Sequence, residues 1–213
     1  MEASQACQTF LNSMKINHDE WVDGTGYNLE ALGLMTEAER EQVVPLLAKR
    51  LETSPDWREI EALKALRTPE ARYALIVAMS YGNLDTRLRA TEALRETGEP
   101  VDLESILVET LTKTDLMTGL SHAIDVAAEH PSPRVQETLL DRALNGNDDQ
   151  RIHCAALALF HGGKADEPFD WNHRPFFLRF VDENRRTQIE AYRELCQRLG
   201  VAPKSSGSDT STP

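Results

Sequence analysis

The sequence contains few cysteines, no long apolar run and no sustained period-two alternation, and each shortage excludes a class of protein. Cys7, Cys154 and Cys196 are odd in number and form no C-x-x-C pair, so we expect three reduced thiols, as suits a cytoplasmic protein. No apolar run approaches the ~20 residues that cross a bilayer. Residues 1–12 lack a basic start and an apolar core, so we expect no signal peptide. Without period-two alternation, we expect no β-sheet.

Positive charge is also scarce. The chain has 23 Lys and Arg residues against 35 Asp and Glu residues, which gives a formal net charge of −12 with histidine neutral. A surface of this sign repels DNA and RNA, so general nucleic-acid binding is not expected. A basic protein partner fits the charge better.

The most informative feature that is present is an internal repeat. The segment 68–72 (Thr-Pro-Glu-Ala-Arg) aligns with 132–136 (Ser-Pro-Arg-Val-Gln), 64 residues further on, and the same offset carries 83–87 onto 147–151. Half of this offset, 32 residues, places Leu75, Leu107 and Leu139 in register. A fixed period in this range is typical of stacked helical units.

The apolar spacing predicts helices over most of the chain. Thr36 with Glu39 forms a capping box, Asp56 precedes another helix, and Pro69 fits a first turn. We expect further helices that end near residues 82, 97, 112, 129, 144, 160 and 199, whereas residues 18–27 and 165–175 are expected to be loops. The predicted organisation is a flexible leader (1–14), one domain (15–200) and a disordered tail (201–213).

Residues 83–94 resemble the second helix of a HEAT-like repeat, with Asn83 and Asp85 at the turn, an Arg, and small residues before Leu94. This resemblance covers roughly residues 55–162. It implies an all-α, HEAT-like solenoid of about four to five helix pairs with an atypical C-terminal cap. The ankyrin and tetratricopeptide patterns are absent.

A second resemblance covers about residues 15–200. The segments 19–27, 56–63, 163–171 and 174–180, which contain Trp21, Trp57 and Trp171, are similar to a family of small bacterial HEAT-repeat immunity proteins of polymorphic toxin systems. The resemblance implies an α-superhelix without catalytic activity, whose partner is a toxin domain.

Helical spacing places acidic residues in two rows. Asp85, Arg89, Glu92 and Glu96 share one face of one helix, and Thr118, His122, Asp125 and Glu129 share a face of a later helix. In a solenoid such second helices line the concave side, so the rows predict an acidic groove for a basic partner; the alternative is an ordinary solvated face. Trp171 is either part of the terminal cap or an interface anchor. The candidate partner-binding residues are Asp85, Glu92, Glu96, His122, Asp125, Glu129 and Trp171.

Signals for chemistry are weak. His122 and His130 are eight residues apart, as are His153 and His161, which is too far for two ligands of one metal on one helix. We therefore expect no metal site, no cofactor and no catalytic residues, and we interpret Cys154 as a core thiol.

The favoured function is that of a non-catalytic protein-binding module, specifically a cytoplasmic immunity protein that neutralises a basic bacterial toxin domain through its acidic surface. The alternatives are a general scaffold or adaptor and, less favoured, a HEAT-like lyase or nucleic-acid-modifying enzyme. The sequence leaves open which toxin is bound, which face binds it and the oligomeric state.

Overall fold

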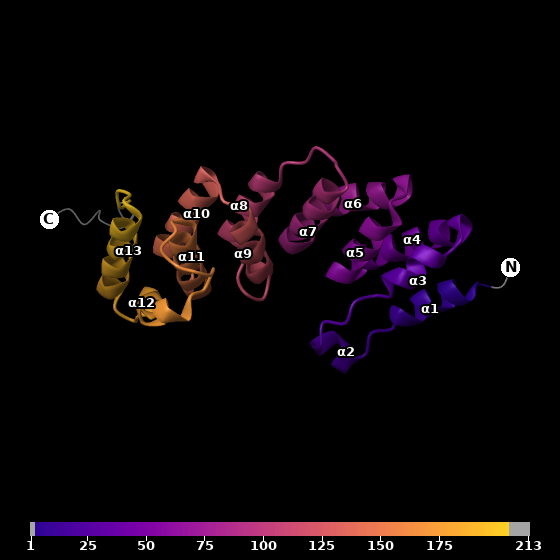
Figure 1. Ribbon diagram of the computed structural model, residues 1–213, viewed down its shortest axis with the longest axis horizontal. Helices are drawn as coiled ribbons and strands as arrows, with labels where there is room; N and C mark the ends of the chain where they lie inside the picture. The colour runs from indigo at the N-terminus through magenta and orange to yellow at the C-terminus, as the bar shows by residue number, and fades with distance from the viewer. Residues whose placement is uncertain (1–2, 205–213) are drawn as a thin grey trace. The chain divides into compact units, whose positions relative to one another are not determined.

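A computed structural model describes residues 3–204, which contain helices and no strand (Figure 1). The all-α class is therefore confirmed for this part of the chain. The α-helices are α1 (Gln5–Ser13), α2 (His18–Val22), α3 (Leu29–Leu34), α4 (Glu37–Thr53), α5 (Trp57–Leu66), α6 (Pro69–Tyr81), α7 (Leu84–Glu96), α8 (Leu103–Lys113), α9 (Leu120–Glu129), α10 (Pro133–Asn145), α11 (Asp148–His161), α12 (Arg174–Leu178) and α13 (Arg185–Leu199). Single 3₁₀ turns occur at Trp171–His173 and Arg179–Val181. None of the helices in residues 3–204 combines the length and the apolar character that a membrane span needs.

The chain divides into two compact units, with the boundary at the start of α8 between Leu103 and Glu104. The sequence predicted one domain over 15–200, whereas the structure groups the helices into two compact units. In the first unit α4 contacts α5 and α6, and α5 contacts α7. In the second unit α11 contacts α9, α10 and α13.

The predicted helix starts are confirmed by their capping bonds. The Thr36 hydroxyl accepts the backbone N–H of Glu39 at 3.3 Å, and the Glu39 carboxylate accepts the backbone N–H of Thr36 at 3.0 Å. Asp56 accepts the backbone N–H of Arg58 at the start of α5. These bonds satisfy backbone donors that the first turn of a helix leaves without partners.

The internal repeat corresponds to two helix pairs with the same caps. Thr68 and Ser132 begin α6 and α10, each followed by a proline in the first turn. Asn83 and Asn147 begin the second helix of each pair. Leu75, Leu107 and Leu139, which follow each other at intervals of 32 residues, are all buried.

Glycine is required between the two helices of each pair. A Cβ atom on Gly82 would lie 2.6 Å from the carbonyl oxygen of Ala78 and 2.8 Å from the Thr86 side chain. On Gly146 it would lie 2.5 Å from the carbonyl oxygen of Arg142. Both contacts are too short for a real Cβ atom, so the tight connection requires glycine.

The N-terminal segment differs from the expected flexible leader. Residues 5–13 form α1, whose Phe10 is fully buried and meets the ring of Tyr27 edge to face at 6.0 Å. Ser4 caps this helix, and its backbone N–H donates to the Glu39 carboxylate at 2.7 Å. The prediction for 1–14 is therefore wrong for residues 3–14, and residues 1–2 lie outside the described part.

Other boundaries also differ from the predictions. Residues 18–22 form the short helix α2, capped by Asn17, where a loop was expected. Helix α9 begins at Leu120 instead of near residue 116, so Thr118 precedes the helix and does not belong to its acidic row. Residues 201–204 have no secondary structure, and the rest of the predicted disordered tail, 205–213, lies outside the described residues.

The burial of Phe10 leads to a stability prediction. Phe10→Ala should lower the free energy of unfolding of the first unit by about 3–5 kcal/mol, because the ring leaves a cavity among packed side chains. Thr9→Ala, at an exposed position of the same helix, should change it by less than about 0.5 kcal/mol. Urea denaturation followed by circular dichroism measures both changes. Equal midpoints for the two variants would mean that α1 does not pack on the core.

The contacts of Glu39 lead to a pH prediction. The backbone N–H groups of Ser4 and Thr36 stabilise its carboxylate and lower its pKa from 4.5 to about 2. A carboxyl with a lowered folded-state pKa contributes stability above the unfolded value, and this contribution is lost as pH falls from about 4.5 to about 2. Glu39→Gln should remove this part of the acid dependence of the urea midpoint, whereas Glu37→Gln in the same turn should retain it. Identical acid profiles for wild type and Glu39→Gln would contradict the prediction.

Candidate functional site

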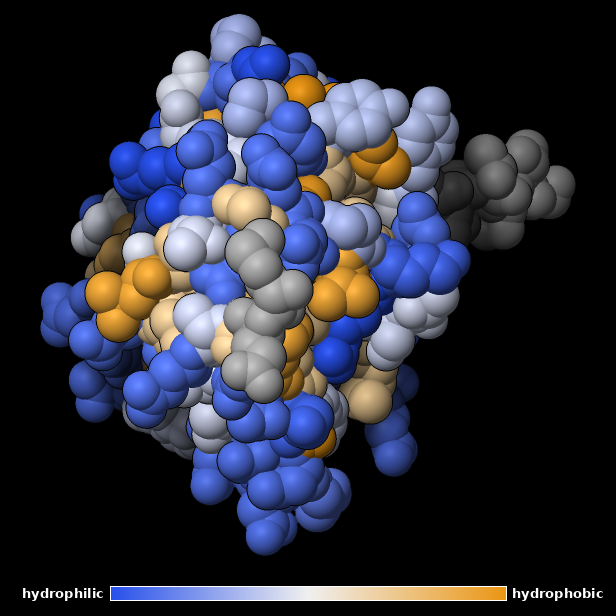
Figure 2. All heavy atoms as spheres, turned by 90° about the vertical axis from the view of Figure 1, so that its right-hand side faces the viewer, coloured by the Kyte–Doolittle hydropathy of each residue, from blue (hydrophilic) through white to orange (hydrophobic). Residues whose placement is uncertain are grey.

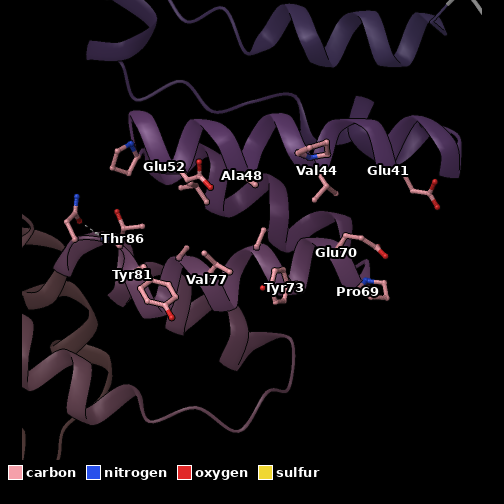
Figure 3. A pocket seen from close by; sticks show the side chains of 17 residues that line it. Glu41, Val44, Ala48, Glu52, Pro69, Glu70, Tyr73, Val77, Tyr81 and Thr86 are labelled. Carbon is pink, nitrogen blue, oxygen red and sulfur yellow. Dashed lines mark hydrogen bonds between the residues drawn. The ribbon is translucent and has the colours of Figure 1, made fainter.

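A groove of about 770 Å³ lies between α4 and α6 in the first unit (Figure 3). The two helices run in the same direction, with Glu41 and Glu70 at one end and Glu52 and Tyr81 near the other. The apolar part of the lining comes from both helices and from the residues that follow α4 and precede α6: Val44, Pro45, Ala48, Leu51, Pro55, Pro69, Tyr73, Ala74, Val77, Ala78 and Tyr81.

The spacing of residues on each helix explains the shape of the groove. Tyr73, Val77 and Tyr81 are four residues apart and therefore line one stripe of α6. Ala74 and Ala78 are buried beside this stripe. Small residues beside large exposed ones produce a surface that is low in the middle and high at the edge.

Tyr73 and Tyr81 are the most conspicuous residues of the groove. Their exposed fractions are 68% and 85%, although each lies beside an apolar floor. Figure 2, which views the molecule from the right-hand side of Figure 1, shows apolar side chains at the surface in small groups among polar ones. A groove that gathers apolar side chains and two exposed aromatic rings in one place is characteristic of a binding surface.

The charge around the groove has one sign. Its carboxylate lining residues are Glu41, Glu52 and Glu70, and among residues 3–204 no Lys or Arg lines it. Glu52 pairs with Lys49 at 3.2 Å. Within residues 3–204, neither Glu41 nor Glu70 forms an ion pair, so the end of the groove that they share is acidic.

Pro45 adds an acceptor at the same end. It lies within α4 and has no N–H, so it cannot donate to the carbonyl of Glu41 one turn earlier. That carbonyl therefore lacks its usual helical donor. A donor-rich cationic group is the chemistry that this end of the groove fits.

The predicted acidic row on α7 is partly neutralised within the unit. Asp85 pairs with Arg89 at 2.9 Å, and Glu96 pairs with Lys64 of α5 at 3.0 Å. Glu92 is half-buried. The α7 row therefore presents less negative charge than the sequence suggests.

The second predicted row lies on α9 in the other unit. Asp125 and Glu129 are exposed, one turn apart, and His122 is half-buried on the same helix. Among the described residues, Asp125 and Glu129 form no ion pair. Asp125 and Glu129 therefore lie together on one face of α9. The α7 row belongs to the first unit and the α9 row to the second.

Trp171 lies in an aromatic cluster near the C-terminal end of the second unit. Its exposed fraction is 65%, its ring meets Phe169 edge to face at 5.9 Å, and the Arg174 guanidinium lies over it at 5.4 Å. The neighbouring Asp170 is buried and accepts the backbone N–H groups of Asp166 and Asn172, which keep its pKa low. Trp171 is thus partly covered by Phe169 and Arg174 and otherwise exposed, so both predicted roles remain open.

A buried charged cluster was not predicted from the sequence. Glu59 is 1% exposed, accepts a hydrogen bond from the Tyr27 hydroxyl and forms an ion pair with Arg50 Nε at 3.0 Å. Burial raises the pKa of Glu59 and of Tyr27. Arg58 next to it donates to the carbonyl of Thr25 at 2.6 Å. The cluster fastens residues 25–27 to α5, and its partners are too far apart in sequence to show any local signal.

Within residues 3–204, no three His, Cys, Asp or Glu side chains are placed to hold a metal ion. All three cysteines are free and buried, and burial raises the pKa of the Cys154 thiol to about 12. A thiol that stays protonated is a poor nucleophile, which fits the interpretation of Cys154 as a core residue.

Comparisons with protein-family models, with curated proteins and with solved structures found no match.

The α4/α6 groove was not predicted from the sequence, because Tyr73 and Tyr81 are separated by two turns and α4 lies a full helix away. The stripe at i, i+4 and i+8 could have indicated an apolar face on α6. That this face remains uncovered depends on how α4 packs beside it.

If the tyrosines serve binding, they should contribute little to folding. Tyr73→Ser and Tyr81→Ser should each change the free energy of unfolding by less than about 0.5 kcal/mol, since both rings are exposed. Leu75→Ala, at a buried position of the same helix, should cost about 2–5 kcal/mol. Urea denaturation of the three variants tests this, and a large loss for either serine variant would make that ring part of the core.

Proposed function

We propose that this chain is a non-catalytic protein-binding module, and specifically a cytoplasmic immunity protein that binds and neutralises a cognate bacterial toxin. The observation that carries the binding role is the α4/α6 groove, with its apolar floor, two exposed tyrosines and acidic end. The immunity role rests in addition on the resemblance of residues 15–200 to bacterial immunity proteins.

We also propose a HEAT-like array of helix pairs. Two features support it. The pairs α6–α7 and α10–α11 have the same caps at the same offset. In the first unit the first helices of consecutive pairs contact each other, α4 with α6, and so do the second helices, α5 with α7. In a repeat array each unit buries its apolar face against the next, which produces these like-with-like contacts.

The acidic surface has a supporting role in this proposal. Asp125 and Glu129 are exposed and adjacent, and they suit contacts with basic side chains of a partner. Asp85 and Glu96 already pair with Arg89 and Lys64, so we assign them less weight. Charges of this kind speed association and select partners more than they add affinity.

Two alternatives remain. A scaffold or adaptor with a different protein partner would use the same groove, and only the identity of the partner separates it from an immunity protein. A HEAT-like lyase or nucleic-acid-modifying enzyme is less favoured, because a net charge of −12 opposes nucleic-acid binding.

The immunity proposal predicts protection in a co-expression assay. Cells that express the toxin domain encoded beside this chain should survive when wild-type protein is co-expressed, and should die with an empty vector. Protection at equal expression should be retained by Leu34→Ala, which alters an exposed apolar residue outside the groove. Death despite abundant folded protein would exclude this toxin as the partner and remove the support for immunity.

A further inference from the structure

We propose that the α4/α6 groove binds a basic amphipathic helix supplied by the protein partner. This inference rests on the proposed binding function and specifies the chemistry of the occupant. The length, the walls and the charge of the groove support a helical, basic occupant.

The groove has the length of a short helix. Glu41 and Glu52 mark its two ends along α4 and are eleven residues apart, which corresponds to about 16 Å of helix axis. A helix of about three turns covers this distance. The volume of about 770 Å³ is large enough for one face of such a helix and its apolar side chains.

The walls favour a helix over an extended peptide. Both are α-helices, whose interior N–H and C=O groups already bond to each other, apart from the Glu41 carbonyl beside Pro45. An extended peptide would bury its own backbone groups against this surface with few partners, which costs free energy. A helix satisfies its own backbone and brings only side chains to the groove.

The floor also has the periodicity of a helix-packing surface. Val44 and Ala48 on α4, and Ala74 and Ala78 on α6, are each four residues apart. Such rows form the grooves into which the side-chain ridges of another helix pack. Apolar side chains of the occupant at i, i+4, i+7 and i+11 would lie over the alanines between Tyr73 and Tyr81.

Charge complementarity makes the occupant basic. Glu41 and Glu70 share one end of the groove, and no Lys or Arg of residues 3–204 lines it. A Lys or Arg side chain beside the apolar stripe would reach this end and donate hydrogen bonds to it. An acidic helix would be repelled at the same place.

Fluorescence anisotropy with synthetic peptides tests the inference directly. The probe is a labelled, end-capped peptide of about 14 residues with a leucine stripe at i, i+4, i+7 and i+11, and with lysines on the flanks. Its controls are a composition-matched isomer whose leucines face all sides, the same stripe with glutamates replacing the lysines, and the lysine probe with a central proline that breaks the helix. The full chain should bind the probe at least about tenfold more tightly than each control.

Protein variants locate the binding site. Tyr73→Ala with Tyr81→Ala should weaken the probe about tenfold or more, and Glu41→Lys with Glu70→Lys should weaken it similarly while improving the glutamate peptide. Glu167→Lys with Glu183→Lys, an equal charge change at two exposed acids of the other unit, should leave binding within about twofold. Circular dichroism of each variant confirms that it is folded.

The possible results separate this inference from the proposed function. Equal binding of the stripe and its isomer, or loss of binding with Glu167→Lys and Glu183→Lys but not with the groove variants, would overturn the inference. Equal binding of the proline peptide would mean an extended occupant and would also overturn it. If wild type protects cells and the Tyr73/Tyr81 and Glu41/Glu70 variants protect equally well, the immunity function stands and the groove assignment is wrong.

Discussion

Between α6 and α7 the chain reverses over two residues, Gly82 and Asn83, and this turn sets the arrangement of the helices on either side. The helix ends at Gly82 because a side chain there would collide with the carbonyl of Ala78 and with Thr86. The next helix begins at once because Asn83 accepts the backbone N–H of Thr86 at 2.9 Å. So short a connection holds the two helices against each other, and the same sequence of caps holds α10 against α11.

Once α7 is fixed against α6, the packing on α4 and α5 decides which surfaces are covered. Leu75 and Leu94 are buried in the core, and the other side of α6 lies beside α4 with alanines at the contact. Alanines allow two helices to approach but do not fill the space above them. The groove therefore forms where small, closely packed residues lie beside two large ones, Tyr73 and Tyr81. The rings of both tyrosines are exposed and do not pack into the core.

Several charged side chains of the first unit pair with partners inside the same unit. Lys64 is half-buried and lies between Glu61 and Glu96, which raises its pKa through hydrogen bonds and charge, against the opposing effect of burial. Glu59 is buried and is held by Tyr27 and Arg50. Some acids thus have partners within the first unit, whereas Glu41 and Glu70, which line the groove, form no ion pair within residues 3–204. The net charge of −12 does not reveal which acids are paired and which are not.

The sequence by itself determined the local features: the all-α class, the helix starts at Thr36 and Asp56, and the offset that relates α6–α7 to α10–α11. These depend on side chains that act within about one turn of their own backbone, so neighbouring residues suffice to predict them. Only the tertiary structure decided that α1 packs through Phe10, that Glu96 is paired with Lys64, and that an apolar groove lies open between α4 and α6. Those features depend on residues brought together from distant parts of the chain, and their positions follow from packing that no local pattern contains.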